Sequence, residues 1–446
     1  MKKVLMLIFF LSFWLPYSLH AQEFSLDDLY GLALKKSGTI KISEENVYIA
    51  EKEKDRALST LIPRFSAFGY HTRYSEEKTV NASLMQPEYT NEWGLRLDQS
   101  FSLSGRELTA LRIAGEGIKQ SMLELRAAKE EYLFSVASSY YNVLKSKKAL
   151  EIARANVQRL TKHRDAARTR LEVGKATKTA LLRAEAQLAG AHSDQIRAEN
   201  NLRLAKAVLA RTAGISGEYD LREPDSDGTV PVHEEELMLL TGDCRMGVLD
   251  CLKERALSER AEIKKLRIQK QIAEDRVGYA RGAYWPRLSI EGVYYRQENE
   301  PSTPLEMKER IYGALKLEFP FFEGGLRVAE VAQAKARLRQ AEHSLSDMKQ
   351  SVKVEVENSY LNLLAEWAVI SRLKAEAAYA LDNYNAVSKQ FRYGLADSVA
   401  VMDANTLLIT AERQLANAGY DYQLSILRLR KATGTLLKRI ISENRE

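Results

Sequence analysis

Cysteine, proline and glycine are scarce over long parts of this sequence. Cys244 and Cys251 are the only cysteines among 446 residues; in an oxidising compartment they could pair, and an unpaired couple is an equal alternative. None of the nine prolines lies in 88–223 or 321–446, and glycine is absent from 326–393. Because these two residues interrupt helices, their absence predicts helices up to roughly 100 Å long.

The sequence also lacks an excess of one charge. It has 66 Lys and Arg residues against 60 Asp and Glu, and acids and bases alternate along stretches such as 151–165. A nucleic-acid interface needs clustered positive charge, so this pattern argues against nucleic acid as a partner and favours solvated helix faces. With 45% apolar and 28% charged residues, a wholly disordered or collagen-like chain is excluded.

The first 21 residues have the features of a secretory signal peptide. Two lysines precede an apolar run over 4–15, and Ala21 stands before the expected cleavage site. The mature chain is therefore expected to begin near Gln22 and to be exported. No later run of 18 apolar residues occurs, so no transmembrane helix is predicted.

An apolar stripe begins at residue 331 and follows the spacing of a coiled coil. Its members alternate steps of three and four: Val331, Ala334, Leu338, Ala341, Leu345, Met348 and Val352. After Val352 the stripe slips by one position, which relaxes strict supercoiling. It then continues at Val356, Tyr360, Leu363, Trp367 and Ile370. The pattern predicts a long helix packed along most of its length against others.

Residues 95–214 and 315–434 align without a gap at an offset of 220, so Gly174 corresponds to Gly394. Slightly upstream the offset is 223, and Pro63 corresponds to Pro286. We therefore expect two related structural units, 22–214 and 251–446, joined by a linker over 215–250.

Each unit is expected to contain a β-hairpin, over 63–104 and over 286–322. The second strand of each alternates apolar and polar residues, as in Trp93, Leu95 and Leu97, and aromatic residues flank the strands. Strands of about ten residues bounded by aromatics are typical of outer-membrane barrels, and they also fit an ordinary hairpin.

Two hairpins supply only four strands, which is too few to close a barrel around a pore. An open sheet cannot lie in lipid with unpaired edges. If the strands cross a membrane, several chains must share one barrel. Three chains would supply twelve strands and a bundle of long helices around a hollow centre.

Several motifs make the sequence resemble the TolC-like outer membrane efflux protein family over nearly all of the mature chain. The matching residues are Ser25, Leu26, Asp27, Asp28, Ala33 and Leu34; Pro63 and Pro286; the segment 319–325; Val173, Gly174, Tyr393 and Gly394; and the segment 429–434. The segment 99–105 departs from the pattern, since it lacks the proline and one glycine present in 319–325.

The resemblance implies a mainly α protein with β-structure, in which each chain gives four strands to a trimeric, twelve-stranded barrel in the outer membrane. A long α-helical barrel would continue across the periplasm. Such conduits dock with a periplasmic adaptor (membrane fusion) protein and an inner-membrane pump, in efflux or type I secretion. The protein would be a passive channel without cofactors.

Motifs of enzymes were sought and not found. The six histidines are scattered, and 233–237 fails the two-histidine zinc pattern. The segment 115–120 lacks the third glycine of a dinucleotide fingerprint, and 173–177 lacks the upstream glycine and the closing hydroxyl of a phosphate loop. No catalytic residue, metal site or cofactor is therefore predicted.

Two sets of residues are candidates for function. Gly174 and Gly394 interrupt helices where a tight turn is needed. An exposed turn needs no partner, but the resemblance implies that the adaptor contacts these turns. The expected docking residues are Val173, Gly174, Lys175, Tyr393, Gly394 and Leu395.

The resemblance also places Asp403 at a constriction, where three copies would form a carboxylate ring that favours cations. Asp397 with Arg392 is a further candidate for the gate. The alternative interpretation of Asp403 is an ordinary solvent-exposed aspartate on a helix face.

A rival interpretation is a secreted or periplasmic structural coiled-coil scaffold without a pore. It explains the heptads and the export signal, but not the alternating strands that follow matching prolines in both halves. An exported enzyme would need a catalytic constellation, and the sequence has none.

Overall fold

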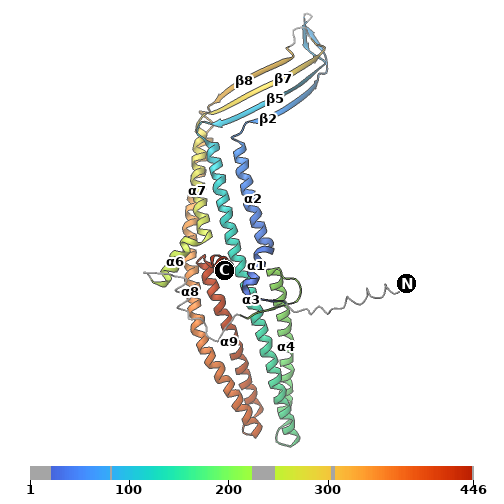
Figure 1. Ribbon diagram of the computed structural model, residues 1–446, viewed down its shortest axis with the longest axis vertical. Helices are drawn as coiled ribbons and strands as arrows, with labels where there is room; N and C mark the ends of the chain where they lie inside the picture. Colours follow the sequence, from blue (N-terminus) through green and yellow to red (C-terminus); the bar gives the residue numbers. More distant parts are fainter. Residues whose placement is uncertain (1–21, 81–82, 224–246, 303–306, 444–446) are drawn as a thin grey trace, which may run out of the picture.

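The computed structural model describes residues 22–80, 83–223, 247–302 and 307–443. The predicted signal peptide, 1–21, and Cys244 lie outside the described residues. A four-stranded sheet lies at one end of an elongated molecule, and long helices extend from it to the opposite end (Figure 1).

Two helices run most of the length of the helical part. α3 (Arg106–Glu172) has 67 residues and α8 (Leu326–Tyr393) has 68, so each is about 100 Å long. Both follow a glycine in the left-handed conformation, Gly105 (φ 72°) and Gly325 (φ 85°), which turns the chain from a strand into a helix. In the described part of the chain, no helix is both long enough and apolar enough to span a membrane.

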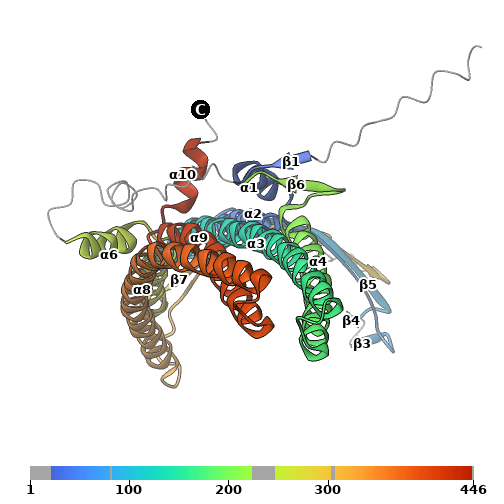
Figure 2. The same ribbon diagram turned by 90° about the horizontal axis from the view of Figure 1, so that it is seen from below.

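Each long helix returns through a shorter antiparallel one. α4 (Lys178–Ala213) packs along α3, and α9 (Ser398–Ala432) packs along α8. Because α3 also packs against α9, the four helices form a single layer, which Figure 2 shows as a curved wall.

Small elements cover the convex side of this wall. They are β1 (Gln22–Phe24), α1 (Leu26–Lys36), β6 (Tyr219–Leu221), which pairs in parallel with β1, and α10 (Leu436–Glu443) (Figure 2). Leu133, Tyr140 and Leu144 of α3 are buried in the core that these elements share with it. The Tyr140 hydroxyl donates a hydrogen bond to the Arg222 carbonyl, which ties the segment after β6 to α3.

Three further helices pack on this wall. α2 (Gly38–Ser59) packs on α3, while α6 (Val248–Glu259) and α7 (Ala261–Arg281) pack on α8; a short 3₁₀ turn, η1 (Gly282–Tyr284), follows α7. Cys251 lies in α6 and is disulfide-bonded. The Arg112 guanidinium donates two hydrogen bonds, of 3.0 and 2.9 Å, to the Asp275 carboxylate and joins α3 to α7.

The sheet is entirely antiparallel, in the order β2 (Arg64–Arg73), β5 (Tyr89–Ser102), β7 (Arg287–Glu300) and β8 (Glu309–Glu318). A small hairpin of β3 (Lys78–Val80) and β4 (Ser83–Gln86) lies within the segment between β2 and β5. Within the described residues, β2 and β8 each pair on one side only, so the sheet has two open edges.

The two faces of this sheet differ sharply. Register places apolar side chains of all four strands on one face: Phe65 and Ala67; Trp93, Leu95 and Leu97; Leu288, Ile290 and Tyr294; Ile311, Leu315 and Leu317. Several are strongly exposed, including Ile311 at 81% and Leu315 at 76%. The opposite face carries charged groups such as Arg96 and Glu291, 3.7 Å apart. A single chain therefore leaves the apolar face of this sheet exposed.

Candidate gate and docking tip

The two turns at the far end from the sheet have related backbone geometry. α3 ends at Glu172 and the chain passes Gly174 (φ 73°); α8 ends at Tyr393 and the chain passes Gly394 (φ 86°). Both values lie in the left-handed region that glycine adopts without strain. The two returning helices start at side-chain caps, since Thr177 accepts from the Ala180 N–H and Asp397 from the Ala400 N–H.

The expected docking residues lie on these turns and are largely exposed. Val173 is 60% exposed, Tyr393 74% and Leu395 81%, and Lys175 is exposed as well. Large apolar side chains at an exposed helical tip are a surface that a partner could cover.

Arg170 of α3 bridges the two turns within one chain. Its guanidinium donates to the Phe391 carbonyl at 2.5 Å and to the Lys175 carbonyl at 3.2 Å. It also lies 4.8 Å from the centre of the Phe391 ring. The end of α8 is thereby attached to the end of α3.

His163 makes a second link between the same helix pairs. Its side chain is buried, its ring lies 4.7 Å from the Phe391 ring, and its Nε2 is 2.8 Å from the Ser398 hydroxyl at the start of α9. Burial lowers the pKa of His163. The imidazole is therefore neutral at pH 7, and the bond to Ser398 carries no buried charge.

Arg159 makes the third and most extensive link. It donates to the Asn405 side-chain carbonyl at 3.1 Å and to both carboxylate oxygens of Glu412 at 3.3 and 3.1 Å. Asn405 in turn donates to Asn156 at 2.8 Å. These groups are partly or largely buried between α3 and α9, where charge-assisted hydrogen bonds are stronger than on an open surface.

The structure gives the three gate candidates different surroundings. Asp403 is exposed on α9, and its carboxylate makes no hydrogen bond or ion pair within the described chain. Asp397 uses its side chain as the cap of α9, and Arg392 is exposed at the end of α8. Within the described residues, Asp397 and Arg392 do not form an ion pair with each other.

The three interhelical links were missed at the level of sequence. His163 counted there only as one of six scattered histidines, Arg159 belongs to the alternating charges of 151–165, and Arg170 follows shortly after them. Their partners lie about 220 to 250 positions away, on α8 and α9. No spacing along α3 alone could reveal them. Among the described residues, no cluster of three or more His, Cys, Asp or Glu side chains is placed to hold a metal ion.

Comparison with known proteins defines the class. The chain matches the family described as Outer membrane efflux protein over residues 29–215 and 252–435, and it belongs to that family. This confirms the resemblance carried by the motifs. The class of function is an outer-membrane channel of tripartite efflux or secretion systems, and the family consists of channel proteins rather than enzymes.

Individual relatives agree with this assignment. The chain is 25% identical over 384 residues to outer membrane protein TolC of Vibrio cholerae, covering 85% of this chain and 83% of that protein. It is 22% identical over 458 residues to outer membrane protein TolC of Escherichia coli, covering 98% and 87%. The solved structure of CusC matches with a TM-score of 0.80 at 18% identity and covers 95% of each chain; this likeness shows the fold.

Proposed function

We propose that three copies of this chain form a continuous conduit, with a twelve-stranded barrel in the outer membrane and an α-helical barrel in the periplasm. The observation that carries the proposal is the sheet, which has one exposed apolar face, one polar face and two open edges. Pairing β8 of one copy with β2 of the next would remove both edges, turn the apolar face to lipid and enclose the polar face.

The proposal includes the route to the membrane and the partners. The signal peptide over 1–21 is removed, the mature chain begins near Gln22, and two related units, 22–214 and 251–446, flank the linker 215–250. The helical tip receives a periplasmic adaptor protein, and an inner-membrane pump supplies the energy. The channel itself conducts cargo passively, and none of its own residues takes part in a chemical reaction.

Single-channel recording tests the conduit and the gate together. Purified protein from the outer-membrane fraction is expected to insert into a planar bilayer and to show small, cation-preferring openings. Three Asp403 carboxylates at the tip would attract cations. Asp403→Asn should then lower cation selectivity and weaken block by multivalent metal ions.

Two outcomes would contradict these expectations separately. Recovery of the protein in the soluble fraction, without insertion, would favour the coiled-coil scaffold and remove the conduit. Discrete openings whose selectivity and metal block survive Asp403→Asn would keep the conduit and exclude Asp403 from the constriction.

Adaptor docking at the tip is tested with bulky substitutions rather than with changes of charge. Ala176 and Ala396 lie just after the two turn glycines, and tryptophan at either position would obstruct a partner. We expect Ala176→Trp and Ala396→Trp to abolish adaptor crosslinking and efflux while bilayer conductance persists. Undiminished efflux and crosslinking in both variants would rule out docking at these turns.

A further inference from the structure

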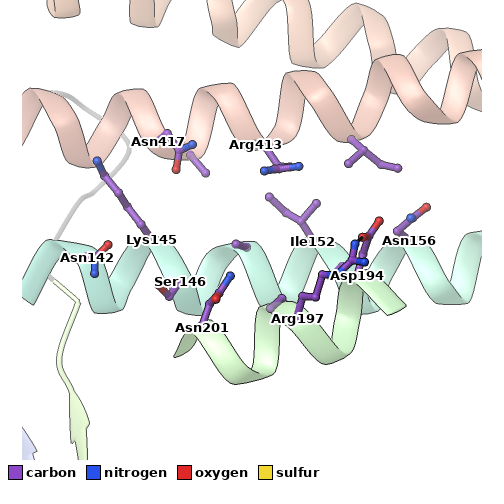
Figure 3. Close-up of a pocket in the computed structure, with 15 residues that line it drawn as sticks. Asn142, Lys145, Ser146, Ile152, Asn156, Asp194, Arg197, Asn201, Arg413 and Asn417 are labelled. Atoms are coloured by element: carbon purple, nitrogen blue, oxygen red, sulfur yellow. Dashed lines mark hydrogen bonds and ion pairs between the residues drawn. The ribbon is translucent and has the colours of Figure 1, made fainter. Parts of the chain in front are cut away.

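A polar groove of about 480 Å³ runs along α3 between α4 and α9 (Figure 3). Its lining on α3 ends at Asn156, well before the end of that helix at Glu172. Lys145 and Ile152 reach from α3 toward α9, and Arg413 comes from α9. Four asparagines add amide groups to the lining: Asn142, Asn156, Asn201 and Asn417. This volume lies in the range of sites that hold small molecules.

The groove lies on the concave side of the wall. Tyr140 faces the elements on the convex side, and Ala149 of the groove is nine residues later, which is half a turn around α3. Asn142 is likewise on the opposite side from Tyr140. In the proposed trimer, on which this inference rests, the concave side lines the channel.

Positive charge exceeds negative charge in the lining. Lys145, Arg197 and Arg413 face one acid, Asp194. Lys145 pairs with Asp421, and Arg197 lies 3.2 Å from Asp194 in an exposed pair. The Arg413 guanidinium is exposed and makes no hydrogen bond or ion pair within the described chain, so its five donors face solvent in the groove.

The amides supply further hydrogen-bond donors beside this charge. The side chains of Asn142, Asn201 and Asn417 make no hydrogen bond within the described chain. A guanidinium fork with neighbouring amide donors matches the planar oxygens of a carboxylate or the oxygens of a phosphate. A cationic solute would be repelled by the guanidinium, and a neutral solute would form hydrogen bonds without the added attraction of opposite charge.

We propose that this groove is a binding site for small organic anions that carry carboxylate or phosphate groups, held by Arg413 with Arg197 and the surrounding amides. Such a site in the channel wall would favour anionic cargo on its way to the barrel. The groove would act separately from the Asp403 carboxylates expected at the tip, which lie nearer the start of α9.

Calorimetric titration of the full mature protein in detergent with citrate tests the site, with pyrophosphate as a second anion and sucrose as a neutral control. Arg413→Gln should weaken citrate binding about tenfold, because one charge-assisted contact is lost. Asp194→Asn should strengthen it severalfold, because the only acid in the described lining is removed and Arg197 is released.

Arg203→Gln is the matched control. Arg203 is an exposed arginine of α4 on the side of the helix turned away from the groove, nine residues after Asp194. Its loss should leave citrate binding unchanged. Equal weakening by Arg203→Gln, or full binding by Arg413→Gln, would overturn the site.

The titration does not depend on conduction, so the two proposals fail separately. A channel that conducts but binds citrate equally well after Arg413→Gln would exclude the groove and leave the conduit in place. Citrate binding that depends on Arg413, in protein that never forms channels, would keep the site and remove the conduit.

Discussion

Gly94→Val is expected to abolish accumulation of folded protein in the outer membrane, and Gly94→Ala to reduce it severely. Gly94 lies in the middle of β5, between β2 and β7. A Cβ atom there would lie 2.8 Å from both the Phe68 ring and the Tyr295 Cβ, and closer still to the Tyr294 carbonyl oxygen. The last is a backbone atom within a strand, so a change of rotamer cannot relieve the contact.

The expected cost is about 3 kcal/mol or more for alanine, at the upper end of overpacking effects. Valine adds two further methyl groups in the same place. In a barrel of three chains the clash would recur three times. Yield from the outer-membrane fraction and resistance to protease measure the loss.

Gly69→Ala provides the control in the neighbouring strand. A Cβ at Gly69 would meet only the Glu92 carbonyl oxygen, at 3.8 Å, which is an ordinary contact. This variant should accumulate like the parent protein. If Gly94→Ala accumulated equally well, β5 would not be held between β2 and β7 in this register.

Local patterns were enough to predict the long helices and the strands. The absence of proline and glycine permits α3 and α8 to continue for about 100 Å. The stripe from residue 331 has buried members at Ala334, Val352 and Val356. Trp367 continues the stripe in sequence and is nevertheless 46% exposed. Apolar periodicity identifies one face of a helix, but it does not show how far along that face the neighbouring helices pack.

Contacts between distant segments could not be predicted in the same way. Nothing in 89–102 distinguishes Gly94 from a glycine that only adds flexibility, since the atoms that crowd it come from β2 and β7. The hairpin of β3 and β4 was also missed, because the segment between β2 and β5 is polar and contains Pro87. The exposed turns were predicted from Gly174 and Gly394, whereas the docking role and the place of Asp403 came from the family resemblance and stay predictions.

The links between α3 and the α8–α9 pair lead to the second large effect. Arg159→Ala should increase the fraction of time for which the tip is open. The substitution removes the bonds to Asn405 and Glu412 and leaves the Glu412 carboxylate, 28% exposed, without this partner. Loss of one partner from a partly buried, hydrogen-bonded charge pair costs about 1–3 kcal/mol.

This cost applies to each of three copies in the proposed trimer. A change of about 1–3 kcal/mol shifts a two-state equilibrium roughly 5- to 150-fold, and a tip that opens in concert would add the three contributions. Arg159→Lys should give a smaller effect, because lysine keeps the charge but cannot form the two-pronged contact with Glu412. Open probability in planar bilayers is the measurement.

Arg168→Ala distinguishes a specific latch from general loosening of the tip. Arg168 pairs with Glu185 at 3.2 Å, but this pair joins α3 to α4 within one helix pair and is largely exposed. Exposed pairs contribute little, and this one does not hold α9. We therefore expect Arg168→Ala to conduct like the parent. Equal opening by Arg159→Ala and Arg168→Ala, or no change in either, would show that α9 is not held to α3 through Arg159.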